Sequence, residues 1–469
     1  MVNWVVFFLY IITFFIAIYN IIIQYRRKKV VNAFICFHIA FILYYLFIPI
    51  IILLFIKLYP NQVDGFAFRI SQADSYDLIS AFSYTIIAYI IILVVYSIKG
   101  RSNILESNII AKKNIETDQV GYSDTRIYHI ALAAGILTLI IGITAEIFIA
   151  NSFGGILKAI AMGDKIRAFG SDRTNYIAQN RLFIFILMVS SLASTYFFVY
   201  TLRIYRRFII KLLFLLSLLA SIFFLMFNAG KLGILLFILT FFIDFAYRKT
   251  KHPFIFTGVF LIIGLLLLGL LDNLFFYLSY GYFNENNSSM MSFINEFSFP
   301  YFNILNVSKI NDIYGFRWGV DFVSWVVNII PTGILKIFGL AKIESQYMFT
   351  TEYYNHITGF SGGIPTDLLT LGIRQFGIIG IVVISILISV LCKYLDRIID
   401  KIHSTKFTFM TLRISSIMFI LVPYADLDAF VRNKYDMLLI LIFSIIVHKG
   451  RLKIKSAYEI NKDFYIQQR

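Results

Sequence analysis

Residues 362–380 read GGIPTDLLTLGIRQFGIIG, and they join a long polar segment to an apolar one. Two glycines and Pro365 loosen the backbone immediately before a helix start, which Thr366 or Asp367 can cap. The first turn of such a helix presents backbone N–H groups that attract negative charge. We therefore expect an anion site at the start of this helix.

The same helix carries two opposite charges on one face. Asp367 and Arg374 are two helical turns apart, which separates them by about 10.5 Å along the axis. Neither charge is stable in lipid, so the pair either belongs to a polar site or marks the point where the chain enters the membrane. The stretch alone leaves both interpretations open.

The composition places the chain among polytopic membrane proteins. Hydrophobic residues make up 59% of the 469 residues and charged residues only 14%, a balance that soluble domains do not have. The net charge of +16 is typical of loop lysines and arginines that orient spans and meet anionic headgroups, and it does not indicate nucleic-acid binding. Cys36 and Cys392 fall in apolar runs, so they predict neither a disulfide framework nor a metal cluster.

Apolar runs predict an all-α fold with about eleven membrane spans in a single membrane domain, residues 1–469. The first run has no basic segment before it and is long enough to span, so we expect no cleavable signal peptide. The spans are expected at residues 5–23, 30–56, 78–98, 130–150 and 182–202, in two runs ending near 227 and 247, and at 254–271, 367–392, 407–422 and 437–447.

Basic residues set the orientation of these spans. The segments expected inside hold 26 lysines and arginines, the segments expected outside hold 15, and Arg413 lies within the tenth span. This bias places the N-terminus outside. Residues 151–181 then form an outer loop that is unusually basic for its side. Residues 272–363 form a large outer loop, which reaches the ninth span through 364–366.

Residues 322–340 are apolar enough to be considered as a twelfth span. Pro331 and Gly333 interrupt the run, Lys336 would lie inside it, and a span here would move the basic segment after span nine to the outside. We predict an interfacial or re-entrant helix instead.

Several basic residues stand apart from the orientation bias, because they lie at or near the outer face in separate segments. They are Arg167, Arg173, Lys231, Arg317, Arg374 and Arg432. Long basic side chains often reach up to lipid headgroups, which is the alternative explanation for each of them. Together they predict one anion site on the outer side.

Carboxylates share the outer face with these cations. They are Asp164, Asp172, Glu352, Asp367, Asp426 and Asp428. Asp428 and Arg432 have the i, i+4 spacing of a plain helix ion pair, which is the simpler interpretation of those two residues.

Several chemistries lack their motif in this sequence. A GK[ST] phosphate loop, a dinucleotide fingerprint and HExxH are all absent. Only His356 of the six histidines is expected outside, so we expect no metal site, and no cofactor is indicated. The cytoplasmic segments are short and mostly basic, so any reaction is expected at the outer face.

Three features, in this order, resemble the O-antigen polymerase (Wzy) family of bacterial membrane glycosyltransferases. NSFGG at 151–155 followed by AFG at 168–170 resembles the family's first basic outer loop, with paired glycines before an arginine-bearing helix. NAGKLG at 228–233 resembles a short family motif, with Lys231 in the basic position. GGIPTDLLTLGIRQFG is the most specific of the three, because it is similar to the pattern Gly-Gly-x-Pro-x-Asp-Leu at the end of the family's large loop.

The resemblance implies a fold and a reaction. The fold is that of a polytopic, GT-C-like membrane glycosyltransferase. The reaction moves a growing glycan from its undecaprenyl-diphosphate carrier onto the terminal sugar of another carrier-linked repeat unit, without a nucleotide sugar. The implied location is the periplasmic face of the bacterial inner membrane, and a chain-length regulator protein is the implied partner.

Such a reaction needs cations for the diphosphate, a base for the acceptor hydroxyl and a lateral opening for the lipid. Guanidinium forks match phosphate oxygens bidentately, whereas a lysine offers a point charge. The diphosphate is therefore assigned to Arg167, Arg173, Arg317, Arg374 and Arg432, with Lys231. Asp367 is the candidate catalytic base, with Arg374 beside it in the catalytic site.

Two alternatives remain open. Related O-antigen ligases carry a His-Asn pair where this chain has Thr366 and Asp367 ahead of Gly377 and Gly380, so the missing histidine counts against a ligase. A lipid-linked oligosaccharide flippase is the transporter alternative. It would need short loops and charges that line a central cavity from both leaflets, so the long 272–363 loop counts against it.

Overall fold

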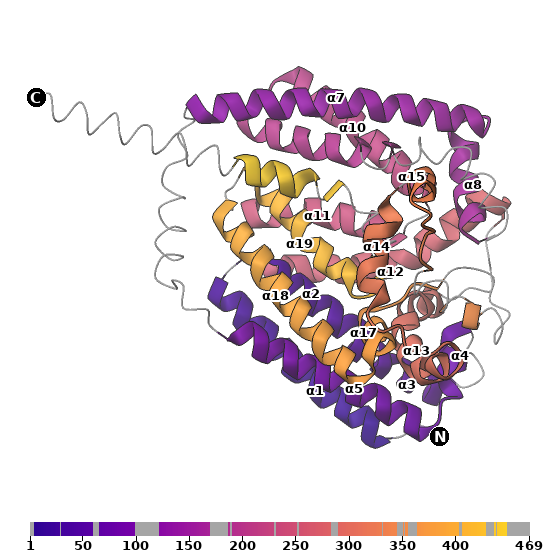
Figure 1. The fold of residues 1–469 in the computed structure, drawn as a ribbon. Coiled ribbons are helices and arrows are strands. Elements are labelled where there is room, and N and C mark those ends of the chain that lie inside the picture. Colours follow the sequence, from indigo (N-terminus) through magenta and orange to yellow (C-terminus); the bar gives the residue numbers. More distant parts are fainter. Residues whose placement is uncertain are drawn as a thin grey trace, which may run out of the picture.

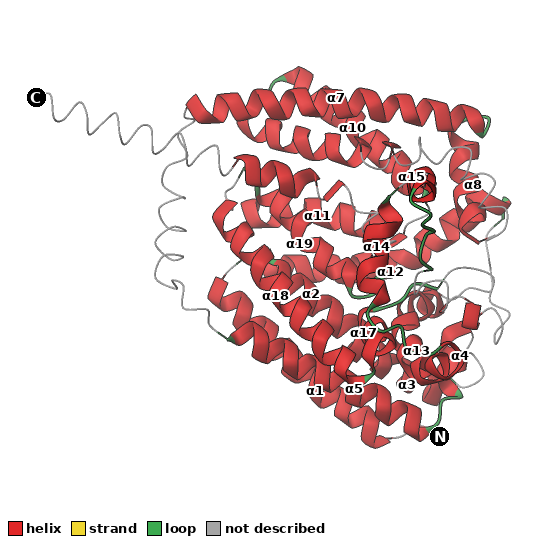
Figure 2. Ribbon diagram, viewed as in Figure 1, coloured by secondary structure: helices red, strands yellow, loops and turns green. Residues whose placement is uncertain are grey.

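The computed structural model is helical, and its described parts contain no strand (Figure 2). The described residues are 4–28, 30–59, 65–98, 122–168, 186–187, 190–228, 231–250, 253–282, 289–330, 332–344, 350, 352–354, 364–402, 406–427, 436–437 and 439–447. The prediction of an all-α fold is confirmed for these residues.

Six described segments are long and apolar enough to cross a membrane. Their helices are α1 (Trp4–Lys28), the segment Ala33–Leu58, α5 (Ser75–Ser97), α7 (Tyr122–Ser152), α10 (Phe208–Phe227) and α18 (Ile378–Ile402). In Figure 1 these helices run roughly parallel, with α1, α5 and α18 on one side of the molecule and α7 and α10 on the other. A helical membrane protein is thus confirmed, and the number of eleven spans stays a prediction.

Further apolar helices fill the space between these two sides. They are α11 (Lys231–Lys249), α12 (Pro253–Tyr280) and α19 (Thr408–Leu421). α19 packs between α2 and α11, and every residue of it except Ile417 is buried. Because α19 is enclosed on all sides, its polar residues face protein and not lipid.

The second span contains a π-helical turn. α2 (Ala33–Ile42) continues through η1 (Leu43–Phe47) into α3 (Ile48–Leu58). Pro49, in the first turn of α3, has no backbone N–H and cannot make a regular helical hydrogen bond. Tyr45 of this turn is fully buried, and its side chain reaches the helix that begins after Asp367.

The prediction that the ninth span is one helix over 367–392 is wrong. The structure has α17 (Leu368–Phe376) followed by α18, with Gly377 between them at a φ of 63°. Glycine adopts this left-handed conformation without strain, so the chain can reverse there. The two helices then touch through their other glycines, because a Cβ on Gly380 would lie 1.8 Å from the carbonyl oxygen of Gly372. The result is a tight hairpin instead of a single span.

The structure describes helices within the predicted large outer loop over 272–366, and the location of this segment outside the membrane stays a prediction. α12 continues to Tyr280, and α13 (Ser289–Tyr314) packs against α3, α4 (Gly65–Ser71), α5, α12 and α17. Tyr301 and Ile310 of α13 are fully buried. α13 is therefore a core helix, and it carries polar side chains into the interior next to α17.

Residues 322–340 do not cross the bilayer as one helix, as predicted. α14 (Val320–Ile329) and α15 (Thr332–Ile337) are 10 and 6 residues long, whereas about 20 residues are needed to span. Val323, Ile337 and Phe338 are exposed on this segment. Its location at the membrane interface stays a prediction.

Several helix ends lie together at one end of the structure. The bias of basic residues predicts that all of them are on the inner side of the membrane. Asp396 of α18 accepts hydrogen bonds from the Ala33 N–H at 2.8 Å and from the Tyr96 hydroxyl at 2.6 Å. The Val31 N–H donates to the Tyr247 hydroxyl of α11 at 2.8 Å. The ends of α5, α11 and α18 and the start of α2 thus lie together, as the predicted alternation of the spans requires.

Candidate functional site

α17 begins at a capped helix end whose N–H groups are already bonded. Asp367 is the N-cap, and its Oδ1 accepts hydrogen bonds from the N–H groups of Leu369 and Thr370 at 3.1 and 3.2 Å. The Leu368 N–H donates to the Val422 carbonyl oxygen at 2.9 Å. The predicted cap is therefore confirmed for Asp367. The predicted anion site at this helix start is wrong, because its N–H groups have protein partners.

The extended residues before α17 are held by two neighbouring elements. The Thr366 carbonyl oxygen accepts a hydrogen bond from the Ala425 N–H at 2.8 Å, next to the end of α19. Asn303 of α13 donates through Nδ2 to the Pro365 carbonyl oxygen at 2.9 Å, and its Oδ1 accepts from the Tyr354 hydroxyl at 2.9 Å. These contacts fix the start of α17 in the interior.

The Asp367 carboxylate is fully buried and only half satisfied. The Tyr45 hydroxyl donates to its Oδ1 at 2.7 Å, whereas Oδ2 has no hydrogen-bond partner among the described residues. Burial raises the pKa of Asp367 above its ordinary value, and the hydrogen bond from the Tyr45 hydroxyl opposes that rise. A raised pKa and a free oxygen are properties of a general base.

Arg374, near the other end of α17, has no exposed surface. Its Nη1 donates to the side-chain oxygen of Asn311 and, at 2.8 Å, to the carbonyl oxygen of Gly315. Its Nε and Nη2 have no partner in the described structure. Burial lowers the pKa of Arg374 to about 10, Arg317 adds to this effect and Asp321 opposes it. Arg374 therefore stays protonated at neutral pH, and its burial excludes the explanation that it reaches up to headgroups.

Unpartnered polar atoms lie along one face of α17, which we call the α17 stripe. Its members are Asp367, Thr370 and Arg374, at positions i, i+3 and i+7, and Thr370 Oγ1 is also buried without a hydrogen bond among the described residues. More than about 90% of buried polar groups in folded proteins are satisfied. Their concentration on one helix face therefore indicates a site for a polar ligand with both acceptor and donor groups.

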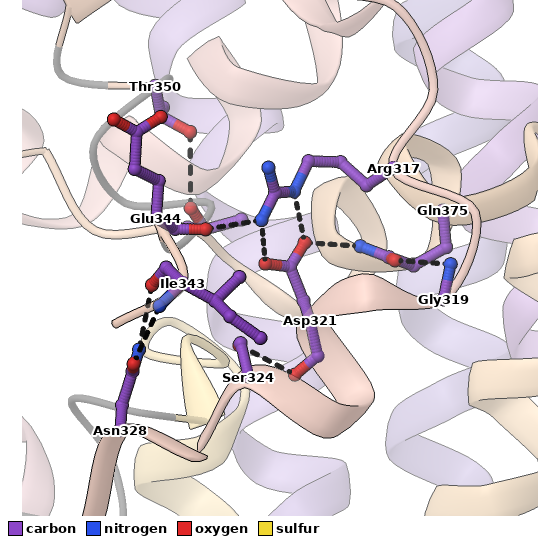
Figure 3. Close-up of polar contacts among 10 residues, drawn as sticks. Arg317, Gly319, Asp321, Ser324, Asn328, Ile343, Glu344, Thr350 and Gln375 are labelled. Carbon is purple, nitrogen blue, oxygen red and sulfur yellow. Dashed lines mark hydrogen bonds and ion pairs between the residues drawn. The ribbon is translucent and has the colours of Figure 1, made fainter. Parts of the chain in front are cut away.

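Arg317, predicted to bind diphosphate, has an acidic partner within the protein. Its Nε and Nη2 donate to the two carboxylate oxygens of Asp321 at 2.9 and 2.8 Å (Figure 3). Asp321 also accepts from the Gln375 side-chain amide at 2.6 Å, and Gln375 in turn accepts from the Gly319 N–H at 2.9 Å. The Arg317 N–H donates to the Arg374 carbonyl oxygen at 2.8 Å. Arg317 thus holds the end of α17 in position.

The other predicted cations have side chains outside the described part of the structure. They are Arg167, Arg173, Lys231 and Arg432. Arg167 lies in α8 (Ile156–Ala168) and Lys231 is the first residue of α11, so their helices are placed although their side chains are not. Of the six outer cations that were predicted to converge, the structure therefore describes the side chains of Arg317 and Arg374.

Glu352 is the outer carboxylate that the structure brings near Arg374. Glu352 is exposed, and after burial it is the main group that raises the pKa of Tyr314, whereas Arg374 lowers that pKa. Both charges therefore lie close to Tyr314. Asp426 is buried in the segment after α19. Other predicted outer residues lie outside the described parts or have no described side chain: Asp164, Asp172, His356 and Asp428.

Sequence reasoning missed Tyr45, Asn303 and Asn311, which touch both ends of the α17 stripe. Asn303 and Asn311 are eight residues apart on α13, in a segment that the polar residues themselves made look like a loop. Tyr45 lies in an apolar span where a tyrosine is unremarkable. Its proximity to Pro49 was the available signal, because a proline inside a span marks an irregular turn.

Among the described residues, no three His, Cys, Asp or Glu side chains gather as metal ligands would. Comparison of the chain with protein-family models, with curated proteins and with solved structures gives no match. The functional interpretation therefore depends on the α17 stripe and on the resemblance in the sequence.

Proposed function

We propose that the chain polymerises undecaprenyl-diphosphate-linked oligosaccharide repeat units at the periplasmic face of the bacterial inner membrane. The GGIPTD pattern supports the resemblance to the polymerase family. The two unpartnered donor atoms of Arg374 support the proposed binding of the leaving group. A buried guanidinium that lacks partners is costly, unless an anion completes it. The leaving group of this reaction is a diphosphate, whose oxygens a guanidinium fork binds bidentately.

The proposed reaction uses the two ends of the α17 stripe. The acceptor hydroxyl gives its proton to Asp367 Oδ2 while its oxygen attacks the anomeric carbon of the donor glycan. The bond between that carbon and the carrier diphosphate breaks, and the diphosphate leaves with the electron pair, bound to Arg374. The two residues are about 10.5 Å apart along the helix, which leaves room for a sugar ring between them.

The neighbouring residues have supporting roles in this proposal. The Thr370 hydroxyl lies between the two charged side chains and bonds a sugar or phosphate oxygen. Arg317, paired with Asp321, positions Arg374 through the Arg374 carbonyl group. Further cations complete the diphosphate site: Arg167, Arg173, Lys231 and Arg432. Because Asp367 and Arg374 have no exposed surface, substrate binding requires the cover over the α17 stripe to open.

Three molecules interact with the enzyme in this proposal. The carrier-linked glycan is already activated by its diphosphate, so it serves as the donor without a nucleotide sugar, and a second carrier-linked unit is the acceptor. The lipid part of each carrier stays in the bilayer beside the spans. A chain-length regulator protein is the proposed partner that sets the final length of the polymer.

The surface glycolipid of a deletion strain tests the proposal. Loss of a polymerase leaves glycolipid with a single repeat unit, because transport and ligation continue, and this single band is the expected result. A flippase defect would leave no repeat unit on the surface, and a ligase defect would leave long chains on the carrier. Complementation with Arg374→Ala should give the single band again. Arg397→Ala, an exposed arginine of α18, is the matched control and should restore the ladder.

A further inference from the structure

A groove of about 360 Å³ lies between α7, α10 and the start of α8, far from the α17 stripe in Figure 1. α7 contributes Ile143, Glu146, Ile147 and Ala150, at the i, i+3, i+4 and i+7 positions of one helix face, and α10 contributes Leu219 and Ala220. The small side chains of Ala150 and Ala220 leave space where larger residues would close the contact. The volume is in the lower part of the range of small-ligand pockets, roughly 300–1,000 Å³.

The groove is apolar except near its outer end, where it contains a carboxylate. Glu146 is the charged residue among those that line it, and it is half-buried without a hydrogen bond or ion pair to any described residue. It lies six residues before the end of α7 at Ser152, about 9 Å along the axis, and inside the segment Thr125–Ser152 that is long and apolar enough to span. An isolated carboxylate at this depth is unfavourable and needs a cation.

The rim of the groove faces the lipid side of the molecule. Ile147 and Leu219 are 55% and 56% exposed although both belong to helices that are candidate spans. A lipid can therefore enter from the bilayer without crossing protein. The negative charge of Glu146 disfavours anionic headgroups, which excludes the diphosphate carrier of the proposed reaction as the natural occupant.

We propose that this groove is a binding site for a phospholipid with a primary ammonium headgroup, of the phosphatidylethanolamine type. One acyl chain lies along the apolar faces of α7 and α10, and the ammonium group donates hydrogen bonds to Glu146. A quaternary choline headgroup cannot donate such bonds, and a glycerol headgroup leaves the carboxylate without a counter-charge. The site is separate from the α17 stripe and does not depend on the proposed function.

Lipid binding to the purified, delipidated protein tests this assignment. Native mass spectrometry would compare phosphatidylethanolamine with phosphatidylcholine and phosphatidylglycerol of the same acyl chains. The wild type should bind phosphatidylethanolamine at least about tenfold more tightly than either of the others, because a charge-assisted hydrogen bond is gained. Glu146→Gln should reduce this preference to less than about twofold. Asp312→Asn, an exposed carboxylate of α13, is the matched control and should leave the preference unchanged.

A second variant tests the groove itself. Ala220→Leu fills the space while Glu146 remains, so phosphatidylethanolamine binding should fall as it does in Glu146→Gln. The wild-type comparison decides the matter even if a variant fails to fold. Equal binding of the three lipids by the wild type, a preference for phosphatidylglycerol, or displacement of phosphatidylethanolamine by undecaprenyl diphosphate would each overturn the assignment.

Discussion

Asp367 has two roles in this account, helix cap and catalytic base, and one substitution separates them. Asp367→Asn keeps Oδ1 as the acceptor for the N–H groups of Leu369 and Thr370 and for the Tyr45 hydroxyl. It replaces the free Oδ2 by an NH₂ group, which cannot take a proton. We expect normal expression and a fall in turnover of at least about a hundredfold.

Asp367→Ala measures the stability that is lost with the helix cap. It removes the helix cap, worth about 1 kcal/mol, and leaves the buried Tyr45 hydroxyl the Val422 carbonyl oxygen, at 3.4 Å, as its remaining described acceptor, beside the Leu369 N–H that donates to it at 3.3 Å. A lost hydrogen bond to a charged group adds about 1.5–3 kcal/mol, so the total is roughly 2.5–4 kcal/mol. The melting temperature should therefore fall in Asp367→Ala and stay close to wild type in Asp367→Asn.

The assay is polymerisation of a purified carrier-linked repeat unit, measured across pH. A base acts only when deprotonated, so turnover should rise with pH through the raised pKa of Asp367. Stability has the opposite trend, because the folded state holds this proton more tightly than the unfolded state. The stabilising contribution of this proton is full below the pKa of Asp367 in the unfolded chain and is lost as pH rises through the pKa of Asp367 in the folded chain. Asp367→Asn should remove this contribution. Near-normal turnover by Asp367→Asn would refute the base assignment and move it to Glu352, near Tyr314.

Three further predictions concern the guanidinium, the hairpin and the orientation. Arg374→Ala should abolish polymerisation and Arg374→Lys should restore only part of it, because lysine lacks the bidentate fork; full activity of Arg374→Ala in the purified assay would remove it from the site. Gly380→Ala should lower stability by several kcal/mol through its clash with the Gly372 carbonyl, whereas Gly258→Ala, with no atom within 4 Å, should be neutral or slightly stabilising in the same melting experiment. Cysteines at positions 290 and 173 should react with an impermeant thiol reagent in cells with a permeabilised outer membrane, and a cysteine at position 115 should not; labelling at 115 alone would invert the topology.

The apolar runs were sufficient to predict a helical membrane protein, because length and hydrophobicity alone decide that class. They were insufficient where helices break or carry polar groups. A hydropathy pattern does not distinguish the break at Gly377 from the polar start of a single span, since Arg374 and Gln375 precede it and isoleucines follow it. α13 was missed for the opposite reason: Asn303 and Asn311 reduce its hydropathy, although both side chains are satisfied by buried partners.

At the candidate site, the sequence predicted the cap at Asp367 and the shared face of Asp367 and Arg374. It could not predict that the N–H groups of α17 are already bonded, because Val422 is distant in the sequence. The i, i+4 spacing of Arg317 and Asp321 was the available signal that Arg317 has an acidic partner. No corresponding signal in the sequence indicates that two N–H groups of Arg374 are buried without a partner among the described residues.

The central claim is that this chain extends a glycan from one carrier diphosphate to another without a nucleotide sugar. The most direct measurement uses the purified protein and an undecaprenyl-diphosphate-linked repeat unit as the only substrate, with glycan length and released carrier diphosphate followed together. We expect a ladder of products and one carrier diphosphate released for each bond formed. Absence of any ladder from folded wild-type protein, or a ladder that appears only when nucleotide sugar is added, would contradict it.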